Sequence, residues 1–163
     1  MTLIEVFVPK GSLSETERRT LGERLVTGLL SGRSELVERA RAMTSVLIHE
    51  PQGWSVGGRG VASTVAPPFI VRLIVPGGHL NDGQRSEAVS RITRVLAEFA
   101  GDTQRLYRNP DAWIQIVEAP DGSLGLFGQV VGNADLIQRI VDPTHDAALH
   151  DRADASQADR QRT

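Results

Sequence analysis

Two short apolar runs, each followed by a longer stretch with apolar residues every three to four positions, divide the chain into similar halves. The runs cover Leu3–Val8 and Phe69–Val75, are rich in Val, Ile, Leu and Phe, and end at Pro and Gly. This pattern predicts largely buried strands. A helix is expected after each run, and in the first half Leu21, Leu25 and Leu29 fall on one helical face.

Both expected helices carry start and stop signals. Ser14 with Glu17 three residues later forms a capping-box pattern, and Asp82 is expected to cap the second helix. Gly32 and Gly101 are expected to end the two helices. The apolar stripe of the second helix consists of Ala88, Ile92, Val95, Leu96 and Phe99.

A second strand closes each half, at Ser45–His49 and at Trp113–Glu118, and a short extra helix is expected at Ser34–Ala42. Glycine-rich stretches follow both closing strands, GWSVGGRG at 53–60 and GSLGLFG at 122–128. They predict hairpins or bulged turns, because glycine adopts positive φ without strain. A helical crossover makes the two strands of each half parallel and right-handed.

The two halves are an internal repeat. VFVPKGSLSETER (Val6–Arg18) matches LIVPGGHLNDGQR (Leu73–Arg85), with the prolines 67 positions apart (76 − 9). Farther along, Pro51 and Pro120 match at a spacing of 69 (120 − 51). Two matching runs in the same order, at nearly equal spacing, indicate duplication.

The duplication predicts an α+β fold, in which two β-α-β units form one four-stranded mixed sheet with both helices on one face. We expect a single domain over residues 1–141, with repeat one at about 2–66 and repeat two at about 68–131. The polar tail at 142–163 is expected to be solvated, or to lie on a neighbouring subunit. The strands are apolar on both sides, so the sheet face without helices predicts an oligomer.

Composition excludes several classes of function. The 163 residues carry 18 basic and 20 acidic side chains, a net charge of −2, which disfavours nucleic acid as a partner. There is no cysteine, and therefore no disulfide, thiolate chemistry or iron–sulfur cluster. No apolar run reaches the roughly 18 residues of a membrane span, so a cytoplasmic protein is expected. Neither a metal-ligand triad nor a phosphate loop is present, and we expect no cofactor and no metal.

The opening residues MTLIEVFVPKGSLSETERRTL resemble the start of the tautomerase superfamily, whose best-known member is 4-oxalocrotonate tautomerase. The last closing strand followed by GSLGLFG is similar to that family's strand and hairpin. The duplicated plan over about 2–131 resembles its longer members, the macrophage migration inhibitory factor group, malonate semialdehyde decarboxylase and cis-3-chloroacrylic acid dehalogenase. The resemblance implies a homotrimer around a central barrel of sheets, which would cover the bare sheet face.

One departure from the family concerns its chemistry. The family uses an amino-terminal proline as acid or base, whereas here Thr2 follows Met1. If Met1 is cleaved, the α-amino group of Thr2, with a reference pKa of about 7.7–8.0, is a candidate catalytic base or imine-forming amine. The alternative is that Thr2 is only the first strand residue. In repeat two, Phe69 stands at the equivalent place, and the internal Pro68 has no free amine.

Four further residues are candidates for binding a substrate. Arg72 lies inside an apolar strand, and the resemblance implies that it holds a substrate carboxylate; the alternative is a salt bridge. Arg59, in a glycine-rich turn, is a second anion contact or an exposed loop arginine. Trp113 and Phe127 are expected to wall an apolar pocket, or else to pack in the core or an interface.

Three hypotheses about function follow. The first is a tautomerase-like isomerase for a small carboxylate-bearing enol, keto or unsaturated acid, with Thr2 in place of the proline. The second is a noncatalytic ligand-binding or structural oligomer of the same family. The third is a ferredoxin-like regulatory domain, because the coarse element order also fits that fold.

Overall fold

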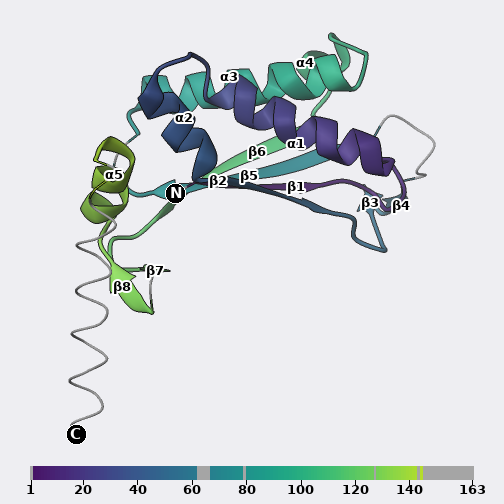
Figure 1. The fold of residues 1–163 in the computed structure, drawn as a ribbon. Helices are drawn as coiled ribbons and strands as arrows, with labels where there is room; N and C mark the ends of the chain where they lie inside the picture. The colour runs from purple at the N-terminus through teal and green to yellow at the C-terminus, as the bar shows by residue number, and fades with distance from the viewer. Residues whose placement is uncertain (1, 62–66, 79, 127, 143, 145–163) are drawn as a thin grey trace, which may run out of the picture.

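A computed structural model describes residues 2–61, 67–78, 80–126, 128–142 and 144. Figure 1 shows one sheet with its main helices on a single side. The sheet strands are β1 (Thr2–Phe7), β2 (Thr44–His49), β5 (Phe69–Pro76) and β6 (Ala112–Ala119). The helices are α1 (Glu15–Leu29), α2 (Glu35–Ala42), α3 (Asp82–Phe99), α4 (Arg105–Arg108) and α5 (Asn133–Val141). Two hairpins complete the fold, β3 (Ser55–Val56) with β4 (Arg59–Gly60), and β7 (Leu124–Leu126) with β8 (Gln129–Val131).

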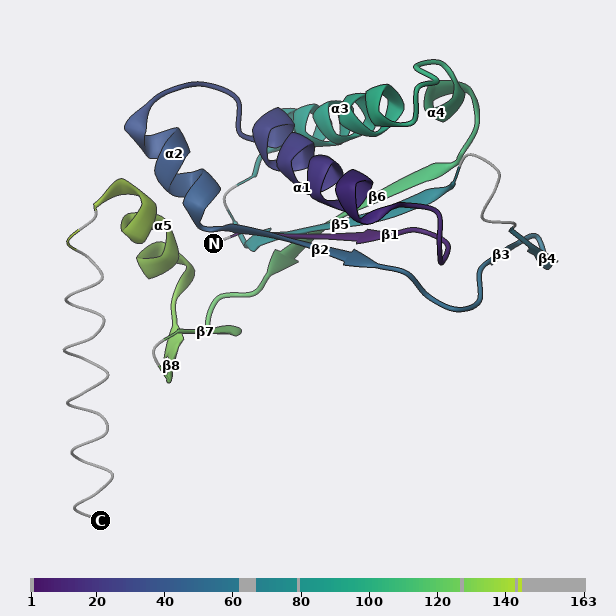
Figure 2. The same cartoon turned by 45° about the vertical axis from the view of Figure 1, so that its right-hand side comes forward.

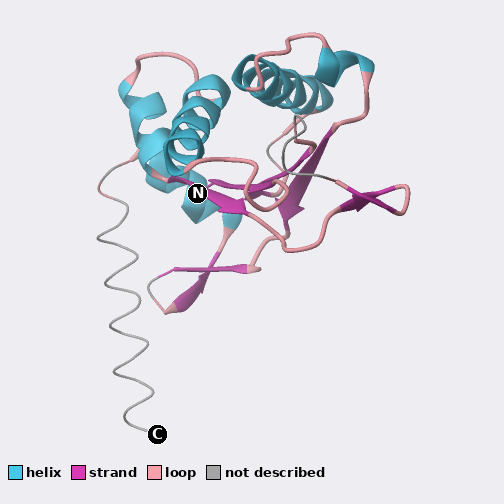
Figure 3. Ribbon diagram, turned by 90° about the vertical axis from the view of Figure 1, so that its right-hand side faces the viewer, coloured by secondary structure: helices cyan, strands magenta, loops and turns pink. Residues whose placement is uncertain are grey.

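The strand order β2-β1-β5-β6 reflects the duplication. Within each repeat the two strands are parallel, β1 with β2 and β5 with β6, as the helical crossovers require. The repeats meet through the antiparallel pair β1 and β5. The predicted α+β fold with a four-stranded mixed sheet is confirmed, and Figure 3 shows α1 and α3 together over one face of it.

The helix starts follow the cap chemistry of the sequence, with one correction. Ser14 caps α1 in a capping box with Glu17, as predicted. The cap of α3 is Asn81, whereas Asp82 is the first helical residue. Asn81 is the better cap because its own N–H donates in return to the side-chain oxygen of Gln84, three residues on. Helix α5 lies beyond the elements that the sequence pattern predicted.

The core lies between the sheet and the helices. Alternate residues of the two central strands are buried there, Ile4 and Val6 from β1, then Phe69, Val71 and Leu73 from β5. The helices contribute the predicted stripes; the buried members are Leu21, Leu25, Ala88, Ile92, Val95 and Leu96. The helix-facing side of the two central strands is therefore buried within one chain.

The opposite side of the sheet, here called the open face, has no helix over it (Figure 2). Strand alternation and the register place on it Leu3, Glu5, Phe7, Ser45, Leu47, His49, Ile70, Arg72, Ile74, Trp113, Gln115 and Val117. Three of its apolar side chains are exposed, Leu47 at 46 %, Ile70 at 36 % and Trp113 at 68 %. The bare apolar face inferred from the sequence is present in the single chain.

The glycine-rich stretches form the two hairpins at opposite ends of the molecule (Figure 2). Gly57 and Gly58 turn the first hairpin with φ of 57° and 76°, a conformation that suits glycine. The second hairpin leads into α5, whose first residue, Asn133, donates from its side chain to the carbonyls of Gly77 and Ala119 at the sheet end. Most of the predicted tail lies outside the described residues, and the domain bounds stay a prediction.

Candidate functional site

A pocket of about 360 Å³ opens beside the first strand residue. Thr2 lines it at the start of β1, together with the end of α1, the end of β5 and the first turns of α3. Its apolar walls are Leu29, Leu30, Leu73, Val75, Leu80 and Ala88, and its polar residues besides Thr2 are Gln84, Glu87 and Arg91. We call this hollow the Thr2 pocket.

The internal repeat offers a second position equivalent to Thr2, at Phe69. The Thr2 N–H donates to the carbonyl of Met43 at 3.2 Å, just before β2. In the same way, the Phe69 N–H donates to the carbonyl of Asp111 at 2.7 Å, just before β6. The Phe69 side chain, however, is only 1 % exposed and belongs to the core. Both positions border a pocket, Thr2 the one described above and Phe69 a second one of about 480 Å³, but Phe69 follows Pro68 inside the chain, so its nitrogen is an amide.

The two charged side chains of the Thr2 pocket form an ion pair with each other. Arg91 donates from Nε and Nη2 to one carboxylate oxygen of Glu87, at 3.0 and 2.6 Å, one turn earlier on α3. Its Nη1 donates to the Leu29 carbonyl at 3.1 Å and to the Ser31 hydroxyl at 2.6 Å. Arg91 therefore binds the carbonyl end of α1 and an acid at the same time.

A second arginine also satisfies the end of α1. Helix α1 has no basic residue in its own last turn, and its final carbonyls need donors from elsewhere. Arg41 of α2 donates to the carbonyls of Leu30 and Gly32, and to the carboxylate of Glu38. The sequence gives no sign of this role for either arginine, because it depends on how the helices pack.

Arg72 lies on the open face, away from the Thr2 pocket. The register pairs Arg72 with Glu5, and Arg72 Nη1 lies 3.9 Å from the Glu5 carboxylate. Its guanidinium is 5.7 Å from the Phe7 ring, which stacks on His49, and His49 Nε2 is 3.2 Å from Glu5. Within one chain the salt-bridge alternative describes Arg72.

The other predicted site residues lie at the far end of the sheet. Arg59 is exposed in β4 of the first hairpin. Trp113 lines a second pocket of about 480 Å³, whose other aromatic and apolar residues include Trp54, Val56 and Ile70. Phe127 lies outside the described residues. A single chain does not bring Thr2, Arg72, Arg59 and Trp113 into one site.

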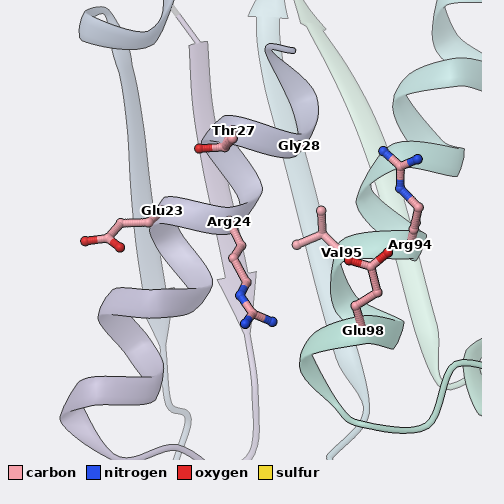
Figure 4. Close-up of a pocket in the computed structure, with 7 residues that line it drawn as sticks. All are labelled: Glu23, Arg24, Thr27, Gly28, Arg94, Val95 and Glu98. Carbon is pink, nitrogen blue, oxygen red and sulfur yellow. The ribbon is translucent and has the colours of Figure 1, made fainter. Parts of the chain in front are cut away.

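A third hollow, of about 440 Å³, lies between α1 and α3 (Figure 4). Four charged side chains line it, Glu23, Arg24, Arg94 and Glu98. Figure 4 shows Val95 of α3 pointing toward Gly28 of α1, where the helices approach closely. It contains none of the predicted site residues. Among the described residues, no cluster of three or more His, Asp or Glu is placed to hold a metal ion, and no helix has the length and apolar character of a membrane span.

Known proteins were compared with this chain by sequence and by structure. No protein-family model matches the chain, and no curated protein matches its sequence. Among solved structures, a fused 4-OT (4-oxalocrotonate tautomerase) that forms an asymmetric trimer is 18 % identical, with 82 % of this chain and 98 % of that chain covered and a TM-score of 0.61. A member of the cis-3-chloroacrylic acid dehalogenase family is 13 % identical, with coverages of 94 % and 99 % and a TM-score of 0.62.

A macrophage migration inhibitory factor-like protein from Entamoeba histolytica is 10 % identical, with 80 % of this chain and 98 % of that chain covered and a TM-score of 0.56. The chain has the tautomerase fold, and the resemblance seen in the sequence is confirmed at the level of fold. The ferredoxin-like alternative is wrong. That fold splits each β-α-β unit, whereas β1 pairs directly with β2, and β5 with β6.

Proposed function

We propose that this protein is a tautomerase-like isomerase that interconverts the keto and enol forms of a small carbonyl compound in the Thr2 pocket. The observation that carries the proposal is the contrast between the two repeats. Both Thr2 and Phe69 border a pocket, but only at Thr2 can removal of Met1 leave a free amine, whereas Phe69 has an amide nitrogen and a buried side chain. The sequence-based hypothesis also gives the substrate a carboxylate held by Arg72.

The α-amino group of Thr2 is the proposed base, once Met1 is removed. It takes a proton from the carbon beside the carbonyl; the C–H electron pair forms the C=C bond, and the carbonyl oxygen takes up a proton. The reverse sequence restores the ketone, so no oxidant or co-reactant is needed. A terminal amine, with a reference pKa of about 7.7–8.0, suits this exchange near neutral pH. Six of the ten residues that line the pocket are apolar.

We also propose that the protein is a homotrimer whose sites are completed between copies. Arg72, Arg59 and Trp113 lie away from Thr2 in one chain, so they reach a Thr2 pocket only if a neighbouring copy supplies them. Two neighbours would also cover the exposed Leu47 and Trp113 of the open face. The fused 4-OT of the same fold is a trimer.

The test combines mass spectrometry with two variants. The intact mass shows whether Met1 is present, and a retained Met1 removes the amine from the mechanism. Thr2→Pro is expected to create or increase tautomerisation of phenylenolpyruvate, assayed both as the acid and as its methyl ester, because it supplies a secondary amine in the same pocket. Thr2→Val is the matched control, since it keeps the primary amine and the branched shape and loses only the hydroxyl. Its activity should equal that of the wild type.

The second candidate is a noncatalytic ligand-binding or structural oligomer. Two observations favour it: the usual proline is absent, and Arg72 and Arg91 both have a carboxylate partner within the chain. A Thr2→Pro variant that folds normally, keeps the native assembly mass and shows no tautomerase activity would support this candidate over the isomerase.

A further inference from the structure

The hydrogen bonds of Arg91 leave it little capacity for a ligand. A guanidinium has five N–H groups. Arg91 uses four of them on Glu87, the Leu29 carbonyl and the Ser31 hydroxyl. The edge formed by Nε and Nη2, which would grip a ligand carboxylate through two parallel bonds, is the edge that holds Glu87. One N–H is left, and it cannot form such a pair.

The side chains that line the pocket also carry no net charge to offer an anion. Glu87 and Arg91 are one helical turn apart and cancel each other. The neighbouring Arg41 is tied to Glu38 and to the carbonyls of Leu30 and Gly32. Arg72, which a neighbouring copy would have to supply, is already paired with an acid on its own sheet.

We infer that the Thr2 pocket takes a neutral carbonyl compound, such as an enolisable ketone, aldehyde or ester, and that Glu87 sets this preference by occupying Arg91. This inference rests on the proposed function, and it replaces the carboxylate substrate of the sequence-based hypothesis. A carboxylate entering the pocket would lose water against apolar walls without gaining a paired guanidinium.

The pocket does contain a hydrogen-bond donor that suits a neutral carbonyl. The Gln84 side-chain oxygen accepts from the Asn81 N–H at 2.9 Å, which fixes the amide at the first turn of α3. The amide nitrogen of Gln84 has no partner among the described residues, and it can donate to a carbonyl oxygen. Leu73, Val75 and Ala88 supply an apolar surface for the rest of the ligand.

The test measures binding and not turnover, so it stands apart from the test of the isomerase. Phenylpyruvate and its methyl ester are titrated into the full-length protein by isothermal calorimetry. The wild type is expected to bind the ester at least about tenfold more tightly than the acid, a difference of about 1.4 kcal/mol. Equal binding, tighter binding of the acid, or binding of neither compound would overturn the inference.

The decisive variant is Glu87→Gln, which frees the Nε and Nη2 edge of Arg91 and leaves a net positive pocket. It is expected to raise the affinity for the acid by about tenfold or more and to leave ester binding nearly unchanged. Glu15→Gln is the matched control, because Glu15 pairs with Arg19 at the same four-residue spacing on the exposed side of α1. An acid affinity that stays the same in Glu87→Gln, or that rises equally in Glu15→Gln, would contradict the role of Glu87.

Discussion

The contact between α1 and α3 predicts opposite effects for two glycine-to-alanine changes in one helix. Gly22 and Gly28 both lie in α1. A Cβ at Gly22 would sit 3.9 Å from Val46, an ordinary contact. A Cβ at Gly28 would come well within 3.0 Å of Val95 Cγ2, closer than real Cβ atoms approach a neighbour. The two helices therefore meet at a distance that only glycine allows at position 28.

The magnitudes follow from two competing terms. Alanine is better than glycine inside a helix by up to about 1 kcal/mol, so Gly22→Ala should stabilise the protein by about that amount or less. Gly28→Ala gains the same term but overpacks the helix interface, which costs about 1–3 kcal/mol. Val95 cannot easily turn away, because a helical valine has one strongly preferred rotamer. The net effect of Gly28→Ala is a loss of up to about 2 kcal/mol.

Urea denaturation followed by circular dichroism measures both effects, with protein concentration held constant because assembly shifts apparent stability. The double variant Gly28→Ala with Val95→Ala should show a favourable coupling, since the smaller side chain removes the clash. If Gly28→Ala stabilised the protein as much as Gly22→Ala does, the close approach of the helices would be refuted.

Three other outcomes are expected. Gly77→Ala should lower the free energy of unfolding by about 1–3 kcal/mol, because its Cβ would lie 2.7 Å from the Ala119 carbonyl oxygen. Gly53→Ala is the control in the same denaturation assay and should be nearly neutral, because its Cβ would have no neighbour within 4 Å. The main-chain N–H of Ser14, at the start of α1, holds the pKa of Glu17 below its ordinary value of 4.5. The stabilisation from this bond is present above pH 4.5 and is lost as the pH falls through the lowered pKa of the folded state. Glu17→Gln should therefore lack that part of the decrease in melting temperature at acid pH. Leu47→Lys, on the open face opposite Glu5, should fold normally by circular dichroism but reduce the sedimenting mass.

Much of the fold could be predicted because duplication and apolar periodicity are both visible in the sequence. The four sheet strands lie within one or two residues of their predicted bounds. The error at the cap of α3 had a signal, because Asn81 with Gln84 three residues later is itself a capping-box pattern. Helix α5 is held by tertiary contacts, such as the bonds from Asn133 to two carbonyls, and these leave no trace in the local sequence.

The candidate site could be predicted only in part. Aligning the repeats placed Thr2 opposite Phe69, but only the structure shows which residues surround each position and that the Phe69 side chain is buried. The pairing of Arg72 with Glu5 depends on the antiparallel register of β1 and β5, which joins segments far apart in the chain. Arg91 reaches the pocket only because α3 packs beside the end of α1, so no local motif could have indicated it.

The open face connects the fold to the proposed assembly, because apolar side chains left bare in one chain are expected to be covered by other copies of it. Sedimentation equilibrium of the full-length protein tests this most directly. The account predicts a mass three times the 17.7 kDa of one chain. A mass of 17.7 kDa at micromolar concentration, with the apolar face left in water, would contradict it.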